Sequence, residues 1–471
     1  MCGIFGVCGV PEAARSVFLG LYALQHRGQE SAGIVAVDAH GVAHGRRGMG
    51  LVSEVFHEDT LAELEGDMAI GHTRYSTAGS SVLANAQPCL VGYREGNLAL
   101  AHNGNLTNAR SLREDLVRAG SIFQSSSDSE VLVHLIARSD GGTPEDQIYD
   151  ALERVEGAYS LLLTVGRTMY AVVDPRGFRP LWLGRLGNAH VLASETCALD
   201  IIGASAVREL GPGEVVRVAD GRVAELPPLR PKPHRRCVFE LVYFARPDST
   251  VFGRSVDAVR RKLGRELARE HPTPGADCVF SVPDSSNSMA LGYAEASGLE
   301  LELALIRNHY VGRTFIHPGQ ALRTAKVKIK FNPVREVLEG KRVVVVDDSL
   351  VRGTTSRELV QMIRQAGALE VHFRVASPPI TGPCYYGIDT PSKHELIASS
   401  HSLDEIRRHL AVDSLAYLSL DGMLRAAGGD PTGFCHACFS GAYPTPTPDQ
   451  PAETGREQAA PSPRLFPVAH G

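Results

Sequence analysis

The sequence predicts two domains of different fold class: an α+β domain with stacked sheets, followed by an α/β domain with a parallel sheet. Up to about residue 226, short strand-like runs follow one another with few helices between them, a pattern typical of α+β domains. From residue 237, apolar strands alternate with helical stretches, which is the spacing of βαβ units. The 471 residues suffice for two or three domains.

The composition restricts the class of protein. With 43% hydrophobic and 21% charged residues, the chain is typical of a globular protein with sizeable cores. The net charge of -5 gives no electrostatic reason to expect nucleic-acid binding. No apolar run approaches the roughly 18 residues that span a bilayer, and the N-terminus shows no signal-peptide pattern. We therefore expect a cytoplasmic protein with no nucleic-acid or membrane partner.

In the first half, Gly, Asn and Asp separate the expected strands. These strands cover residues 3–7, 31–38, 68–76, 98–105, 158–165, 169–174, 190–196 and 213–220, and helical stretches cover 13–25 and 129–137. The stretch "PPLRPKPHRR" (227–236) is rich in proline and basic residues, which marks a linker. We expect the first domain to span residues 2–230.

In the second half, strands are expected at 277–285, 301–308, 341–349 and 369–377, with helices at 288–298 and 354–367. We expect this domain to span residues 237–440. The remaining residues, 441–471, are rich in Pro, Ala and Thr and are expected to form a disordered tail.

The segment "MCGIFG" places a cysteine second in the chain. Removal of Met1 is chemically expected because Cys2 is small, and it would leave Cys2 with a thiol and a free α-amine. An α-amine has a pKa of about 7.7–8.0 and accepts a proton near neutral pH, while the thiolate is a nucleophile. One residue then supplies both nucleophile and base. On its own, however, a cysteine after Met carries no such meaning.

Four later segments favour the catalytic interpretation: "HRGQESAG" (26–33), "GHTRYSTAG" (71–79), "HNGN" (102–105) and "SSSDSE" (125–130). In this order after Cys2 they resemble the N-terminal-nucleophile glutamine amidotransferases, over roughly the first half of the chain. The resemblance implies an αββα sandwich of stacked sheets. It also implies that Cys2 attacks the side-chain amide of glutamine, releases ammonia and forms a thioester that water hydrolyses.

The same resemblance assigns roles to four further residues. Arg74 would hold the α-carboxylate of glutamine as a bidentate fork, and Asp128 would pair with its α-ammonium. Asn103 and the backbone N–H of Gly104 would form the oxyanion hole. The structural alternative is a plain turn at "HNGN", with Arg74 and Asp128 in surface ion pairs. The four segments together favour the functional roles.

A second site is indicated at "VVVVDDSLVRGTTS" (343–356). Four valines predict a parallel strand that is buried on both faces, and ligands bind beyond the carboxyl ends of such strands. Asp347 and Asp348 lie at that end, where they suit hydroxyls or Mg²⁺. The loop that follows leads into a helix N-terminus, which is an anion site. The alternative is a helix-capping turn with solvated aspartates.

This stretch resembles the phosphoribosyl-pyrophosphate signature of type I phosphoribosyltransferases. The resemblance implies that Asp347 and Asp348 bind the ribose hydroxyls and Mg²⁺. "VPDSS" (282–286) matches the pyrophosphate-side loop, with Ser285 as a further contact on the Mg²⁺ side. The residues implied for the 5′-phosphate are Ser349, Arg352, Gly353, Thr354 and Thr355.

A long basic segment resembles the loop that closes over substrate in the same enzymes. It covers residues 310–334, and its cations would screen pyrophosphate and exclude water. These cations are Arg323, Lys326, Lys328 and Lys330.

The chain contains nine cysteines, and we expect no disulfide framework without a secretion signal. Cys8, Cys89, Cys197 and Cys278 are expected to be small buried hydrophobic residues. A different role is indicated by the contexts "RRCVFEL", "GPCYYG" and "GFCHACFSG", which contain Cys237, Cys384, Cys435 and Cys438.

From spacing alone, these four thiols suit zinc or an iron–sulfur cluster, and the Cys-x-x-Cys pair also suits redox chemistry. The contexts resemble the [4Fe–4S] ligands of one branch of the amidophosphoribosyltransferase family, which favours a cluster with a structural or oxygen-sensing role. His436 is expected to be a bystander. That branch usually has a short propeptide, whereas only Met1 precedes Cys2 here, so we expect simple Met removal or a misassigned start.

Both halves together resemble amidophosphoribosyltransferases, from Cys2 to about Tyr443. The implied reaction, the first committed step of de novo purine biosynthesis, converts glutamine, phosphoribosyl pyrophosphate and water into 5-phosphoribosylamine, glutamate and pyrophosphate. The resemblance also implies feedback by purine nucleotides and a homotetramer. The alternatives are an amidohydrolase or transferase with another acceptor, and a regulatory protein that binds phosphoribosyl pyrophosphate.

Overall fold

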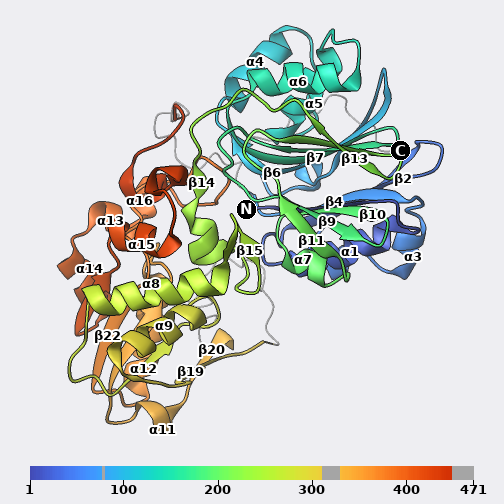
Figure 1. Ribbon diagram of the computed structural model, residues 1–471. Coiled ribbons are helices and arrows are strands. Elements are labelled where there is room, and N and C mark those ends of the chain that lie inside the picture. The colour runs from blue at the N-terminus through green and yellow to red at the C-terminus, as the bar shows by residue number, and fades with distance from the viewer. Residues whose placement is uncertain (77–79, 310–328, 448–471) are drawn as a thin grey trace, which may run out of the picture.

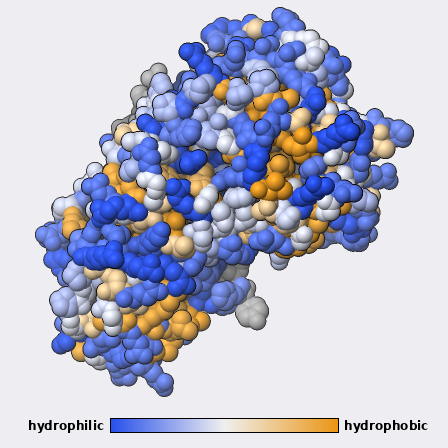
Figure 2. Space-filling model, in the orientation of Figure 1, coloured by the Kyte–Doolittle hydropathy of each residue, from blue (hydrophilic) through white to orange (hydrophobic). Residues whose placement is uncertain are grey.

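The computed structural model describes residues 1–76, 80–309 and 329–447. It has two lobes joined by an extended linker, with the N-terminus buried between them (Figure 1). Most of the surface visible in Figure 2 is hydrophilic, with hydrophobic residues gathered in small patches. No helix of the described residues is long and apolar enough to cross a membrane.

Two antiparallel sheets are stacked in the first domain. One sheet has seven strands in the order β11 (Ser205–Glu209), β9 (Trp182–Leu186), β10 (Ala189–Ala193), β1 (Gly3–Cys8), β4 (Met68–Arg74), β2 (Ser31–Val37) and β3 (Ala43–Met49). The other has six, in the order β13 (Arg222–Leu226), β12 (Val215–Ala219), β8 (Thr168–Val173), β7 (Gly157–Val165), β6 (Gly96–Leu106) and β5 (Cys89–Tyr93). An apolar layer that includes Ile4, Ile70, Ala101 and Leu162 lies between them.

Helices cover the outer faces of this sandwich. The first sheet is covered by α1 (Ala13–Ala23), and the second by α4 (Ala109–Arg118), α5 (Ser129–Arg138) and α6 (Pro144–Arg154). Figure 1 shows the resulting four layers. The order helix, sheet, sheet, helix confirms the αββα fold class that the sequence predicts.

The second domain is built on a five-stranded parallel sheet. Its order is β18 (Glu300–Leu301), β17 (Cys278–Ser281), β21 (Arg342–Asp347), β22 (Glu370–Val375) and β23 (Ser414–Tyr417). One face is covered by α8 (Val256–Glu270), α9 (Asn287–Ser297) and α15 (Leu420–Ala427), and the other by α12 (Thr354–Gln365) and α14 (Leu403–Leu410). This sheet confirms the predicted α/β class.

The valine run of β21 explains why the strand is central. Val344 and Val346 face the α8–α9 layer, whereas Val343 and Val345 face the α12–α14 layer, and all four are fully buried. A strand between two helical layers has no polar face, so its sequence does not alternate.

The expected strand at 301–308 is wrong in one respect. Only β18 (Glu300–Leu301) pairs with the main sheet, and the chain then leaves it to form β19 (Leu305–Arg307), which pairs with β20 (Phe331–Pro333) as a separate antiparallel pair. The pair flanks residues 310–328, which lie outside the described residues. Three cations of the expected closing loop fall within this range: Arg323, Lys326 and Lys328.

Near the C-terminus, packed structure extends past the expected boundary at residue 441. The Tyr443 hydroxyl donates to the Pro383 carbonyl at 2.7 Å, and Thr445 is buried with its hydroxyl 3.0 Å from that of Tyr386. Residues 441–447 therefore pack on the second domain. Residues 448–471 lie outside the described part of the chain.

A buried network of charges joins the two domains. Arg27 and Arg179 of the first domain both contact Glu240 of the second, at 2.8 Å and 3.2 Å. Arg27 also pairs with Glu195 at 2.5 Å, and all four side chains are fully buried. Because each charge has a partner of opposite sign, the network is compatible with its low-dielectric surroundings.

Candidate active site

Cys2 directly precedes β1, near the centre of the first sheet, and only 7% of its surface is exposed. Its thiol lies 3.7 Å from the Tyr75 carbonyl, and Arg27 Nε donates to the Cys2 carbonyl at 3.0 Å. Sequence reasoning missed Arg27, although it lies within the "HRGQESAG" segment. Arg27 fixes the backbone of Cys2 and links it to the buried network.

The chain start lies in an apolar environment. Met1 is fully buried among residues of the second domain such as Val238 and Phe439. This burial lowers the pKa of the Met1 α-ammonium to about 5, because desolvation disfavours the charged form. The α-amine of Met1 is therefore neutral at pH 7.

Arg74 and Asp128 are each fixed by neighbouring groups of the first domain. Arg74 ends β4, next to β1, and is 3% exposed. Its guanidinium lies 3.6 Å from Glu30 and donates to the Ser80 carbonyl at 3.3 Å. Asp128 accepts the backbone N–H of Leu106 at 2.9 Å. This last bond ties the carboxylate to the end of β6, the strand that carries "HNGN".

Asn103 and Gly104 lie within β6. A bond between the two sheets, from His72 Nε2 to the His102 carbonyl at 3.1 Å, places this part of β6 over β4. Burial lowers the pKa of His72 to about 3, so this ring stays neutral. The stacked sheets thereby bring "HNGN" toward the start of β1.

The side chain of Asn103 is fully buried, and neither its Oδ1 nor its Nδ2 has a hydrogen-bond partner among the described residues. A buried amide without partners is costly and needs an explanation. Gly104 allows no side chain, because a Cβ there would lie 1.9 Å from the Ala158 carbonyl oxygen. The unpaired amide of Asn103 suits a site where a ligand oxygen approaches, whereas Gly104 is required by the close approach of β7.

In the second domain, Asp347 and Asp348 lie at the carboxyl end of β21 and are nearly buried. Burial and the Asp348 charge raise the pKa of Asp347, and burial raises that of Asp348. Ser285 and Ser349 donate hydroxyl hydrogen bonds to Asp348, and Ser286 donates to Asp347 at 3.3 Å. Two buried carboxylates side by side are stabilised by a cation.

The loop after this pair forms the start of α12. Gly353 has a φ of 74°, in the left-handed region that glycine favours, and its N-cap position makes no side-chain cap. Thr354 and Thr355 follow in the first turn and are exposed, while Arg352 pairs with Glu395 at 2.9 Å. Uncapped N–H groups at a helix N-terminus are an anion site.

The four cysteines predicted as ligands come together from three segments. Cys237 and Cys435 are register partners of the parallel strands β14 (Arg236–Cys237) and β24 (Phe434–Cys435). All four cysteines, including Cys384 and Cys438, line one pocket. Its other lining residues are Phe178, Tyr386, Ile388, Ala437 and Tyr443. His436 does not line it.

The chemistry of this pocket fits a thiolate-bound group. The backbone N–H of Tyr386 donates to Cys384 Sγ at 3.3 Å, and burial raises the pKa of Cys237 to about 11. Such thiols ionise only when a metal compensates the charge. Among the described residues, no three ligand side chains meet closely enough to hold a single metal ion.

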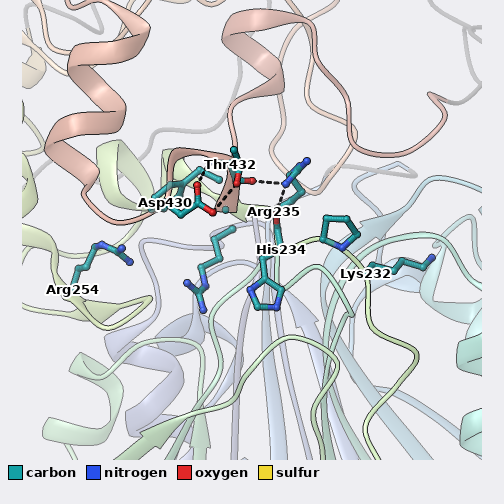
Figure 3. A pocket seen from close by; sticks show the side chains of 10 residues that line it. Lys232, His234, Arg235, Arg254, Asp430 and Thr432 are labelled. Carbon is teal, nitrogen blue, oxygen red and sulfur yellow. Dashed lines mark hydrogen bonds between the residues drawn. The ribbon is translucent and has the colours of Figure 1, made fainter.

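A separate cavity of about 420 Å³ lies at the linker (Figure 3). Its polar lining residues are Lys232, His234, Arg235, Arg236, Arg254, Asp430 and Thr432. None of the residues expected in the two sites lines it.

The fold and the sites define a class of protein: an enzyme with an N-terminal glutamine amidotransferase domain and a phosphoribosyltransferase domain. Residues 72–200 match the family model described as "Glutamine amidotransferase domain". The chain is 54% identical over 452 residues to amidophosphoribosyltransferase 2, chloroplastic, of Arabidopsis thaliana, covering 95% of this chain and 80% of that one. It is 51% identical over 451 residues to amidophosphoribosyltransferase of Bacillus subtilis, covering 94% of each chain. The chain belongs to the amidophosphoribosyltransferase family.

Solved structures agree with this assignment. "Structure of the allosteric regulatory enzyme of purine biosynthesis" superposes with a TM-score of 0.90 at 50% identity, covering 95% of this chain and 97% of that one. The B. subtilis glutamine phosphoribosylpyrophosphate amidotransferase complexed with ADP and GMP superposes with a TM-score of 0.89, also at 50% identity, covering 94% and 98%. The predicted family and enzyme class, an enzyme of purine biosynthesis, are thereby confirmed.

Proposed function

We propose that the enzyme uses two sites in sequence. At the first, Cys2 attacks the side-chain carbonyl carbon of glutamine after Met1 is removed, and its own α-amine takes the thiol proton. Arg74 binds the α-carboxylate of glutamine and Asp128 its α-ammonium. The amine then returns the proton to the departing ammonia, and water hydrolyses the thioester to glutamate.

The observation that carries this mechanism is the buried side chain of Asn103, whose polar atoms have no partner among the described residues. When the substrate carbonyl becomes an oxyanion, Asn103 Nδ2–H and the backbone N–H of Gly104 donate to it. Donors that are already ordered and dry stabilise this charge more than water does.

At the second site, ammonia attacks the anomeric carbon of phosphoribosyl pyrophosphate, and pyrophosphate leaves. Asp347 and Asp348 bind the ribose hydroxyls and hold Mg²⁺, with Ser285 on the same side. Bound Mg²⁺ supplies positive charge to the leaving pyrophosphate. Ser349 and residues 352–355 bind the 5′-phosphate through the start of α12. Ammonia passes between the sites without meeting bulk water, where it would be protonated.

We further propose that Cys237, Cys384, Cys435 and Cys438 hold a [4Fe–4S] cluster. The pairing of β14 with β24 supports this, since a cluster there would join the start of the domain to its C-terminal end. Such a cluster contributes to structure or oxygen sensing rather than to either reaction. Nine free cysteines among the described residues suit a reducing compartment such as the cytoplasm.

Regulation is proposed from the relatives. The ADP and GMP in the B. subtilis structure support feedback by purine nucleotides in this chain. We also propose a homotetramer, which analytical ultracentrifugation would test.

The deciding experiment compares glutamine with ammonia as nitrogen donor. The variant Cys2→Ala should lose glutamine-dependent synthesis of phosphoribosylamine and retain synthesis from ammonia, because the second site does not use the thiol. Loss of both activities in a folded protein would refute the division into two sites. The mass of the purified N-terminus provides a second check, since an active enzyme that retains Met1 would rule out the free-amine mechanism.

A further inference from the structure

A short segment of the second domain, residues 384–387, runs from the four-cysteine pocket to the "HNGN" strand of the first domain. We propose that this segment, the connector, is a positioning element of the glutaminase reaction: it holds Gly104 in place and links that position to the state of the four-cysteine pocket. This inference rests on the oxyanion role proposed above for Asn103 and Gly104.

The contact at Gly104 is close on both sides. A Cβ built on Gly387 would lie 2.9 Å from both the carbonyl carbon and the carbonyl oxygen of Gly104. On the other side, a Cβ on Gly104 would lie 1.9 Å from the Ala158 carbonyl oxygen of β7. Gly104 is therefore confined between its neighbouring strand and the connector. A shift of the connector changes where the Gly104 N–H points.

Two carbonyls of the connector are fixed to the first domain. Asn105 Nδ2 donates to the Tyr385 carbonyl at 2.9 Å. Arg179 donates to the Tyr386 carbonyl from Nε at 3.1 Å and from Nη2 at 2.5 Å. The Tyr386 ring also stacks on Phe178, with 4.4 Å between centroids. These contacts make the connector part of the glutaminase site although it belongs to the other domain.

The opposite end of the connector lies at the pocket. Cys384 and the Tyr386 side chain line it, and the Tyr386 N–H donates to Cys384 Sγ. A group bound by Cys384 thus fixes the position of this residue, which lies three residues before Gly387 in the chain. Loss of that group frees Cys384, and the Tyr386–Gly387 backbone moves with it.

A shift of the connector should affect kcat for glutamine hydrolysis but not the binding of glutamine. In the proposed function, glutamine is held at its α-carboxylate and α-ammonium by Arg74 and Asp128, whereas the hydrogen bonds of the connector described above go to Asn105 and Arg179. A displaced oxyanion donor therefore lowers kcat for glutamine hydrolysis and leaves KM nearly unchanged. Synthesis from ammonia, which needs no oxyanion hole, is retained.

The test is Gly387→Ala in the full-length holoenzyme, with Gly441→Ala as the matched control. Both glycines have a left-handed φ, 100° and 75°, and both lie three residues after a pocket cysteine, but a Cβ at Gly441 meets nothing within 4 Å. For Gly387→Ala we expect kcat for glutamine hydrolysis to fall about 10- to 100-fold, with KM, iron content and ammonia-dependent synthesis near wild type. Gly441→Ala should match the wild type in all four.

Hydrogen exchange provides a readout that does not depend on activity. In the wild-type enzyme, removal of iron with a chelator should speed exchange in peptides covering residues 98–106, and Gly387→Ala should do the same with iron present. Unchanged exchange in this strand after iron removal would refute the link to the pocket.

If Gly387→Ala does not fold, Asn105→Ala tests the same connection, because it removes only the bond to the Tyr385 carbonyl. A fall in kcat without a change in KM supports the proposal, whereas wild-type kcat in either folded variant overturns it. A wild-type enzyme without glutaminase activity would instead refute the proposed function.

Discussion

At the residue scale, the glutaminase site depends on a polar side chain that the rest of the protein leaves without a partner. Asn103 is fully buried, and its amide group has no hydrogen bond within the described residues. Folding would favour an apolar residue at this position. The amide is therefore explained by its use in the reaction.

Replacement of Asn103 by Ala tests this explanation. We expect kcat for glutamine hydrolysis to fall about 10²- to 10³-fold, the usual effect of removing one oxyanion donor, with little change in KM. Thermal stability should not fall, because no hydrogen bond is lost. Asn97→Ala, a change on the same strand at a partly exposed position, is the control. A large rise in KM with constant kcat would assign Asn103 to ground-state binding instead.

Asp347 illustrates a second conflict between stability and function. Its folded-state pKa is raised by burial and by Asp348, so the folded protein holds the proton more tightly than the unfolded chain. The stability contribution of this group is therefore present at low pH and is lost as pH rises through the folded-state pKa.

Asp347→Asn should consequently raise the melting temperature of the ligand-free enzyme at neutral pH and flatten the loss of stability as pH rises from the usual carboxyl range to the folded-state pKa. The same change should raise KM for phosphoribosyl pyrophosphate at least about tenfold, with either nitrogen donor. Differential scanning calorimetry across pH and the two synthesis assays provide the measurements. An unchanged KM would remove Asp347 from the substrate site.

At the scale of the element, the junction of β21 and α12 places an anion site where a strand and a helix meet. The valines bury the strand on both faces, and Gly353 turns the chain at the end of the loop that follows the carboxylates, so that α12 starts at Thr354. The conformation of this turn sets the direction of the first-turn N–H groups.

Gly353→Ala should disturb this turn, because the backbone is left-handed and a Cβ would lie 2.9 Å from Ile397 Cδ1. We expect KM for phosphoribosyl pyrophosphate to rise with both nitrogen donors, while glutamine hydrolysis measured alone changes little. Gly340→Ala is the control, with a similar φ of 72° and nothing within 4 Å of the new Cβ. It should lower stability through backbone strain and leave KM for phosphoribosyl pyrophosphate near wild type. Equal kinetics of the two variants would contradict the phosphate role.

At the scale of the whole molecule, the domains share buried charges as well as apolar surface. Glu240 lies between Arg27 and Arg179, and Arg27 in turn holds the Cys2 carbonyl. Glu240 therefore contributes both to the domain contact and, through Arg27, to the position of the nucleophile.

Glu240→Gln should destabilise the protein by about 3–5 kcal/mol, because it leaves buried guanidinium charge with too little compensation. Glutamine hydrolysis should also fall, since Arg27 loses one of its anchors. Glu58→Gln, which breaks an exposed pair with Arg15, should leave the melting temperature near wild type. Chemical denaturation measures both variants, and equal stabilities would show that the network does not hold the domains together.

Many residues of both sites can be predicted from the sequence because they lie in short contiguous motifs. "HNGN" lies within one strand, and "VVVVDDSLVRGTTS" covers one strand, the loop after it and the start of the next helix. Arg27 was missed because an arginine in a glycine-containing loop gives no local sign of what it contacts. The strand expected at 301–308 was wrong because a short apolar run does not reveal that the chain changes sheets.

The sequence by itself determined the two fold classes, the family, and the residues offered as nucleophile, oxyanion donor and phosphate loop, because these depend on local periodicity and on motifs with fixed spacing. Only the tertiary structure decided that four cysteines from three segments share one pocket, that Glu240 joins the domains, and that Gly387 lies against Gly104. These contacts join residues far apart in the chain. Their geometry comes from the packing of whole layers, which no local pattern encodes.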